Sequence, residues 1–223
     1  MRLTLLLCLG LFATSICAAQ AVVPGGETAT HFYWSLSKSH ELAYKKTIRN
    51  SAELTAEERT GLTEKVIGLI SKYKGNLEST DRKQLRKLAL NSRVEKADLN
   101  SDGNPEFILQ ANDYEAGCGA TGNCAFWVLD KTAQGYRLLL DTRDKQGIGG
   151  AERITIKDEQ HKGYKDIVLA AHDSASEKSL IVERFDGKMY REVACYIANW
   201  ESWDGELHSL KNPDIFPCPA APQ

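Results

Sequence analysis

The spacing of hydrophobic residues changes near Val94, and this change limits the possible fold more than any other feature of the chain. Before Val94 the apolar residues recur every three or four positions, as on one face of a helix. After it they alternate with polar residues, as in strands that are buried on one side. The chain is therefore predicted to be α+β, with a helical region over 24–92 and a β region over 93–196.

Two helices with definite start signals are expected in the helical region. The first begins with a cap at Thr55 and ends near Gly75, and the second opens on a cap at Ser79 or Thr80. An aromatic-rich segment over 31–46 is also expected to be helical. The core-facing positions of the two capped helices are predicted to be Leu62, Val66, Ile67, Ile70, Leu85 and Leu88.

The β region repeats itself. Shifted by 60 residues, the segment RITIKDEQHKGYKDIVLAA aligns with the chain that begins near Val94, and a shift of 54 further on aligns Tyr136 with Tyr190. The difference of six falls in the segment after Asn112. We therefore predict two duplicated four-stranded antiparallel β units, the first with an insertion. The aligned polar pairs are Asp98 with Asp158, Gly103 with Gly163, and Glu106 with Asp166.

The loop DLNSDGNPE, residues 98–106, places oxygen-bearing side chains at alternate positions between two predicted strands. Calcium takes six to eight oxygen ligands, and loops supply them from alternating positions. The alternative is a polar turn in which Asp and Asn bond to their own backbone. Three carboxylates without a cation would repel one another, which favours calcium. An EF-hand is disfavoured, because Leu109 stands where the bidentate glutamate would lie.

This pattern resembles the calcium hairpins of FG-GAP and VCBS repeat proteins, which lie between two strands of a β-propeller blade. The resemblance is strong over 94–110 and looser over 94–196, and Glu106 replaces the commoner aspartate at the last position. It implies a partial-propeller-like arrangement, since two units are too few to close a propeller. It also implies that Ca²⁺ is bound by Asp98, Asn100, Asp102, Asn104 and Glu106.

The second copy of the loop, DEQHKGYKD, departs from the pattern at two positions. Gln160 and Lys162 stand where the first copy has Asn100 and Asp102. A lysine ammonium can neutralise nearby carboxylates without a metal ion. The second hairpin is therefore predicted to be metal-free, with its charge balanced by Lys162.

The N-terminus has the features of a secretory signal peptide over 1–19, with Arg2 before an apolar run and small residues at the end. Cleavage after Ala21 is the alternative. The apolar run is shorter than the roughly 20 residues that span a bilayer, and no later stretch reaches that length. A periplasmic or secreted protein without a membrane span is therefore predicted.

Four cysteines follow the signal peptide. An even number in an exported protein favours disulfides, and pairing by proximity predicts Cys118–Cys124 and Cys195–Cys218. A zinc site is the alternative, but the usual spacing of two to four residues between ligands is absent. The residues over 197–223 are predicted to form a C-terminal tail held by the second disulfide.

Composition and motifs exclude several functions. The chain has 28 basic and 30 acidic residues, so the basic excess of a nucleic-acid-binding protein is missing. A nucleophile elbow and an HExxH motif are absent. The predicted function is an exported, calcium-binding, non-catalytic module that binds an unknown protein or glycan, or interacts with the cell envelope. The alternative is a metal-dependent extracytoplasmic hydrolase.

Overall fold

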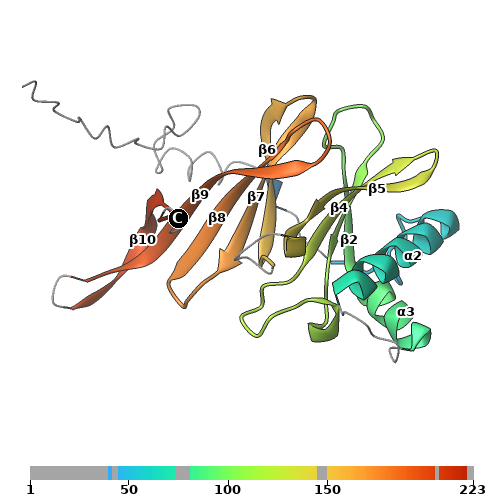
Figure 1. Ribbon diagram of the computed structural model, residues 1–223. Helices are drawn as coiled ribbons and strands as arrows, with labels where there is room; N and C mark the ends of the chain where they lie inside the picture. The colour runs from blue at the N-terminus through green and yellow to red at the C-terminus, as the bar shows by residue number, and fades with distance from the viewer. Residues whose placement is uncertain (1–39, 42–44, 74–80, 145–149, 204–205, 220–223) are drawn as a thin grey trace, which may run out of the picture.

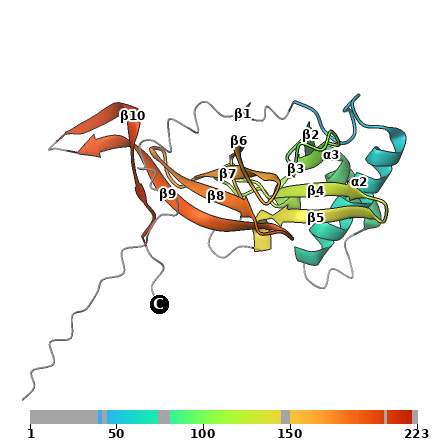
Figure 2. The ribbon, with the colours of Figure 1, turned by 90° about the horizontal axis from the view of Figure 1, so that it is seen from above.

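The computed structural model of the chain describes residues 40–41, 45–73, 81–144, 150–203 and 206–219. It stacks three layers, namely a pair of helices, a four-stranded antiparallel sheet and a six-stranded antiparallel sheet (Figure 1). The helices cover one face of the four-stranded sheet, and its other face packs against the six-stranded sheet (Figure 2). Helices combined with two antiparallel sheets fit the predicted α+β class.

The helices are α2 (Ala56–Tyr73) and α3 (Arg82–Asn91). The four-stranded sheet has the order β2-β3-β4-β5, with β2 (Arg93–Ala97), β3 (Glu106–Gln110), β4 (Phe126–Thr132) and β5 (Gly135–Asp141). The six-stranded sheet has the order β1-β6-β7-β8-β9-β10, with β1 (His40–Glu41), β6 (Arg153–His161), β7 (Tyr164–His172), β8 (Glu177–Phe185), β9 (Tyr190–Trp203) and β10 (Leu207–Pro217). The 3-10 helix η1 (Tyr114–Ala116) follows β3, and η2 (Thr142–Asp144) follows β5.

Side-chain caps fix where the helices begin. Thr55 and Glu58 form a capping box, in which the Glu58 N–H donates to Thr55 Oγ1 at 3.1 Å and the Thr55 N–H donates to Glu58 Oε2 at 3.0 Å. The cap predicted at Thr55 is confirmed. The α3 cap is Asp81, which accepts from the Lys83 N–H at 2.9 Å, so the predicted cap at Ser79 or Thr80 is wrong. The predicted end near Gly75 lies outside the described residues.

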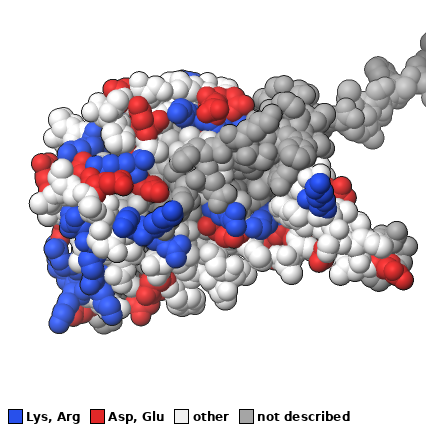
Figure 3. All heavy atoms as spheres, turned by 180° about the vertical axis from the view of Figure 1, so that it is seen from behind, with Lys and Arg blue, Asp and Glu red and all other residues white. Residues whose placement is uncertain are grey.

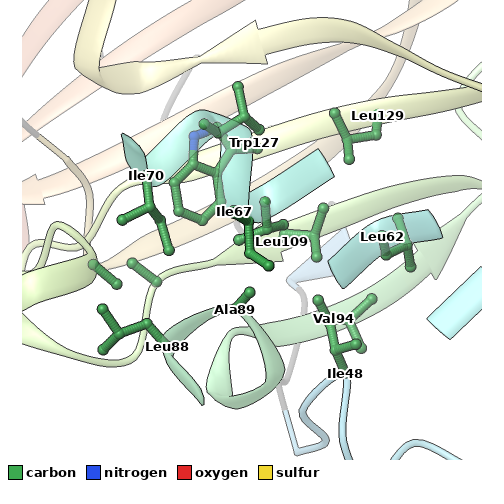
Figure 4. Packing of buried hydrophobic residues seen from close by; sticks show 14 of the residues in the cluster. Ile48, Leu62, Ile67, Ile70, Leu88, Ala89, Val94, Leu109, Trp127 and Leu129 are labelled. Atoms are coloured by element: carbon green, nitrogen blue, oxygen red, sulfur yellow. The ribbon is translucent and has the colours of Figure 1, made fainter. Parts of the chain in front are cut away.

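The first core lies between the helices and the four-stranded sheet. Figure 4 shows Trp127 and Leu109 of the sheet against Ile67 and Ile70 of α2, with Leu88 of α3 below them. All of the predicted core positions of the two helices are buried here. A fully buried side chain of this size stabilises the fold by about 1.5–3 kcal/mol, so this cluster fixes the helices on the sheet.

A second core joins the two sheets. Ile108 and Val128 project from the four-stranded sheet, and Ile167 and Leu169 meet them from the six-stranded sheet. The four-stranded sheet is therefore buried on both faces, which explains why β3 is buried at all five positions rather than at alternate ones.

The two sheets share the pairing register of four consecutive strands. Val94 pairs with Leu109, and Ile154 pairs with Leu169, an offset of 60 in both strands. The later pairs follow an offset of 54, since Val128 pairs with Leu140 and Val182 with Ala194. The β4–β5 ladder shifts register directly after Val128, and the β8–β9 ladder shifts directly after Val182, which is the equivalent position at the offset of 54. The change of offset falls between β3 and β4, where Cys118 and Cys124 lie.

Two predicted boundaries differ from the structure. Most of the helix expected over 31–46 lies outside the described residues, but His40 and Glu41 form strand β1, paired with β6. The segment 197–223 is not simply a tail, because β9 runs on to Trp203 and β10 pairs back along it. The residues of β10 are mostly exposed, so its sequence does not alternate between buried and exposed positions as a strand usually does. Its strand structure comes from pairing with β9.

Both predicted disulfides are present. Cys118–Cys124 closes the loop between β3 and β4, and Cys195–Cys218 ties β9 to the residue after β10. Across the described ranges, the helices are too short or too polar to cross a lipid bilayer.

Candidate metal centre

The loop between β2 and β3 is folded by bonds between its polar side chains and its own main chain. Asp98 Oδ2 accepts from the Gly103 N–H at 3.1 Å. Asn100 Oδ1 accepts from the Asp102 N–H at 3.0 Å, and Asp102 Oδ1 accepts from the Asn104 N–H at 2.7 Å. The last two bonds, each to the main chain two residues on, are typical of Asx turns, and Gly103 has a left-handed φ of 85°.

Glu106 closes the loop from the first position of β3 and is only 1% exposed. Its Oε2 accepts from the Leu99 N–H at 2.8 Å. Burial raises the pKa of this carboxyl to about 7, and the nearby charges of Asp130 and Asp102 add to the rise. The ionised form of Glu106 is therefore disfavoured. A cation bound beside the carboxylate would favour the ionised form and lower this pKa.

Asp98 is the second residue of the loop whose surroundings favour a cation. Its Oδ1 atom is buried and has no hydrogen-bond partner within the described part of the chain. Leaving a buried acceptor unsatisfied costs about 1–3 kcal/mol, and more for a charged group. Such an atom at the first position of the loop fits a cation ligand.

The five predicted ligands lie in one loop, between the end of β2 and the start of β3. Among the described residues, no three His, Cys, Asp or Glu side chains form a group that could hold a metal ion. Asp102 and Asn104 are exposed, whereas Asn100 is half-buried. The donor set itself contains only oxygen ligands and so suits a hard cation such as Ca²⁺.

The loop rests against the second hairpin. Asn100 Nδ2 lies 3.4 Å from the hydroxyl of Tyr164, and Gln160 Nε2 donates to Ser101 Oγ at 2.9 Å. The main chain joins them too, because the Lys165 N–H donates to the Leu99 carbonyl at 2.7 Å. The position of the candidate site is therefore set by both sheets.

The second hairpin has no acidic loop of this kind. The β6–β7 ladder shifts register between Ile156 and Gln160 and then continues, with Gln160 paired to Lys165 and His161 to Tyr164, up to a two-residue turn. Lys162 and Gly163 form this turn, with φ of 51° and 84°. Asp158, the counterpart of Asp98, is exposed.

Arg184, not Lys162, balances the charge of the second hairpin. Asp166 is buried, and its Oδ2 accepts from Arg184 at 3.0 and 3.2 Å. Its Oδ1 lies 2.9 Å from His161 Nδ1. Lys162 instead donates to the main-chain carbonyl of Asp186 at 2.6 Å. The predicted role of Lys162 is therefore wrong, because its strand-tip position directs its side chain away from Asp166.

Sequence reasoning missed Asp130 and Arg184, which are equivalent at the offset of 54. Phe107 pairs with Leu129, and Ile167 pairs with Glu183. The next position of each ladder therefore brings Asp130 beside Glu106 and Arg184 beside Asp166. Asp130 itself is bound by Arg137 at 2.8 Å. The alignment FWVLD with LIVER carried this signal, since it sets an aspartate against an arginine.

The residues His172, Asp173 and Ser174 do not form a catalytic relay. His172 Nδ1 lies 3.9 Å from Glu152, while the Asp173 carboxylate accepts from Ser179 Oγ at 2.6 Å. These contacts give His172 and Asp173 separate partners, and the run is a polar strand end.

Comparison of the chain with protein-family models, curated proteins and solved structures found no match.

Proposed function

We propose that the protein is an exported, non-catalytic β-repeat module that binds Ca²⁺ at its first hairpin and no metal at its second. The observation that carries this proposal is the exchange of Asp130 for Arg184 at equivalent positions. In the first unit the buried Glu106 has an acidic neighbour, whereas in the second the buried Asp166 has a guanidinium.

A buried carboxylate is stable only when a positive charge or hydrogen bonds compensate it. Arg184 does this for Asp166 at 3.0 Å. A cation bound by Asp98, Asn100, Asp102, Asn104 and Glu106 would supply the same compensation in the first unit. Asp98 Oδ1 and Glu106 are the two groups that gain most, since one has no partner and the other a raised pKa.

The relation between the two sheets supports a repeat of the FG-GAP and VCBS kind. Phe107 and Trp127 face the helices, and their counterparts Ile167 and Ile181 face the first sheet. Likewise Val128 faces the second sheet, and its counterpart Val182 lies on the outer face of that sheet. The units therefore stack in the same sense, as successive blades of a propeller do.

Burial of Glu106 favours a structural ion over a catalytic one. A catalytic metal keeps an open coordination position beside a substrate pocket. Glu106 is 1% exposed, at the first position of β3. The alternative, a metal-dependent hydrolase, is favoured only by the pKa of Glu106 near 7, which would suit a general acid or base.

Export is supported by the signal-peptide pattern and by two disulfides. We propose a periplasmic or secreted protein that binds a protein or glycan, with the calcium hairpin stabilising the scaffold rather than contacting the ligand.

Thermal unfolding of the mature protein with Ca²⁺ and with a chelator tests the proposal. Ca²⁺ should raise the melting temperature, since an ion that binds only the folded state stabilises it by about 2.7 kcal/mol at 100 times its dissociation constant. Asp98→Asn should remove this response. Asp158→Asn is the matched control in the second hairpin and should retain it.

Equal melting temperatures with Ca²⁺ and with chelator would contradict the proposal. So would a response that Asp158→Asn removes and Asp98→Asn does not. A hydrolase would be favoured instead if Glu106→Gln abolished a measured hydrolytic activity without changing Ca²⁺ affinity.

A further inference from the structure

We propose that one face of the helical layer binds the surface of an anionic lipid bilayer. This basic face joins the outer side of α3 to the turn that precedes α2. Figure 3 shows a dense group of basic side chains at the end of the molecule that carries the helices. The basic face consists of Lys45, Lys46, Arg49, Arg82, Lys83, Arg86 and Lys87, all of them exposed.

The packing of α3 directs its charges outward. Leu85, Leu88 and Ala89 are buried in the first core. The remaining side of the helix presents Arg82 and Arg86 in one row and Lys83 and Lys87 in another, because residues four apart lie above one another.

The turn over 45–50 adds its charges beside the C-terminal end of α3. The Ile48 N–H donates to the Ser92 carbonyl at 2.9 Å, and the Arg49 N–H donates to the Leu90 carbonyl at 3.0 Å. Arg59 of α2 fixes the turn further by donating to the carbonyls of Ile48, Arg49 and Ser51. The basic face is thus held in one shape before any partner binds.

Folding does not explain this arrangement. Like charges four apart on a helix destabilise it by about 0.2–0.5 kcal/mol per pair, and cations in the first turn oppose the helix dipole. The first turn of α3 holds Arg82 and Lys83 and no acidic residue, and Asp81 at the N-cap is the one described acidic residue at this end of the helix. Glu64 of α2 offsets part of this charge, at 2.8 Å from Arg82 and 3.3 Å from Arg86. The cost indicates a role outside the fold.

The shape favours a planar partner over a single charged polymer. Proteins that bind single-stranded polymers enclose them in a groove, whereas the basic side chains of α3 all stand on the exposed side of one helix. Tyr114 of η1 is 81% exposed beside this helix, and Gln84 of α3 contacts Glu115 of η1 at 3.3 Å. An exposed tyrosine next to a basic helix suits the headgroup layer of a membrane. Because the apolar side of α3 is in the core, the contact is electrostatic and does not insert the helix.

Sedimentation with lipid vesicles tests the proposal, with a chelator present so that bridging by Ca²⁺ plays no part. The protein should bind vesicles that contain phosphatidylglycerol and not vesicles of pure phosphatidylcholine, and salt should weaken the binding. Lys83→Gln with Lys87→Gln should weaken it about 30-fold, from about 1 kcal/mol per basic side chain. The matched control, Lys188→Gln with Lys211→Gln, makes the same charge change elsewhere and should bind as the wild type does.

Equal binding to both kinds of vesicle would overturn the proposal, as would an equal loss in the two double variants. Binding to a soluble acidic polysaccharide or RNA with none to vesicles would overturn it in favour of a polymer partner. Competition by inorganic phosphate at the concentration of lipid phosphate would show a site for single anions instead of a surface.

Discussion

Glu106 and Asp166 occupy equivalent positions at the base of two hairpins, but their surroundings carry opposite charge. Asp130 lies near Glu106, and Arg184 binds Asp166 at 3.0 Å. The difference between Asp130 and Arg184 thus distinguishes the two hairpins. A bound cation would stabilise the first, whereas the second already has the positive charge of Arg184. The contrast leads to two predictions at the scale of single residues.

The metal-free protein should lose stability as the pH rises from about 4.5 to about 7. The folded state holds the Glu106 proton up to about pH 7, whereas the unfolded chain releases it near 4.5. The stability present below pH 4.5 is therefore lost as the pH passes the folded pKa, by up to about 3 kcal/mol. Denaturant unfolding in chelator at several pH values measures this. Glu106→Gln should remove most of this dependence of the unfolding free energy on pH. An unchanged dependence in that variant would contradict the assignment of the effect to Glu106.

Arg184→Gln should destabilise the fold by roughly 3 kcal/mol, because it leaves Asp166 buried without its main partner. The loss should be the same with Ca²⁺ and with chelator. Lys162→Ala is the matched control and should change stability by no more than about 0.5 kcal/mol, since Lys162 is exposed. Urea unfolding of both variants provides the comparison. A larger loss for Lys162→Ala would restore the role predicted from the sequence.

Much of the candidate site could be predicted from the sequence, because its residues are local. The loop from Asp98 to Glu106 can be recognised from oxygen-bearing side chains at alternate positions and from Gly103 among them. The decisive neighbours, Asp130 and Arg184, come from another strand, and only strand register brings them beside the buried acids. The role predicted for Lys162 is wrong for the same reason, since closeness in sequence does not place two side chains on one face of a sheet.

At the scale of elements, α2 and α3 could be predicted because helical spacing, caps and an apolar face agree. The β9–β10 hairpin could not. Most residues of β10 are exposed, including Leu207 and Phe216, so the segment shows no alternation. Its strand structure comes from pairing with β9 and from the disulfide, which are not visible in local sequence.

Two glycines of α2 should respond in opposite ways to the same substitution. A Cβ on Gly61 would lie 2.5 Å from the ring of Tyr136, whereas one on Gly68 meets nothing within 4 Å. Gly68→Ala should stabilise the protein by about 0.5–1 kcal/mol through helix propensity. Gly61→Ala should destabilise it by about 1–3 kcal/mol through overpacking against β5. Thermal unfolding compares the two, and stabilisation by both would show that the helix packs less closely on the sheet.

Removing the Cys195–Cys218 disulfide should release β10 while leaving the rest of the sheets intact. The bridge closes a loop with a sequence separation of 23, which corresponds to about 3 kcal/mol in the chain-entropy account. Hydrogen exchange of a Cys195→Ser, Cys218→Ser variant should speed up in Leu207–Pro217 and stay unchanged in β3 and β4. Faster exchange throughout would mean that β10 supports the core.

At the scale of the whole molecule, two sheets of matching register stack in the same sense beneath a helical layer. The arrangement gives the protein two distinct regions. The candidate cation site lies where the two hairpins meet, and the basic face lies on the opposite side of the first core, on α3. We expect the cation site to stabilise the fold and the basic face to bind the protein to a membrane. Mutations in one region should therefore leave the property of the other unchanged.

The number of calcium ions bound per chain distinguishes the first hairpin from the second. Isothermal titration of the mature protein, stripped with chelator, should show one binding site, and Asp98→Asn should abolish its heat. Two equivalent sites would contradict the assignment of the second hairpin as metal-free. The absence of any calcium heat would reduce the loop from Asp98 to Glu106 to a polar turn.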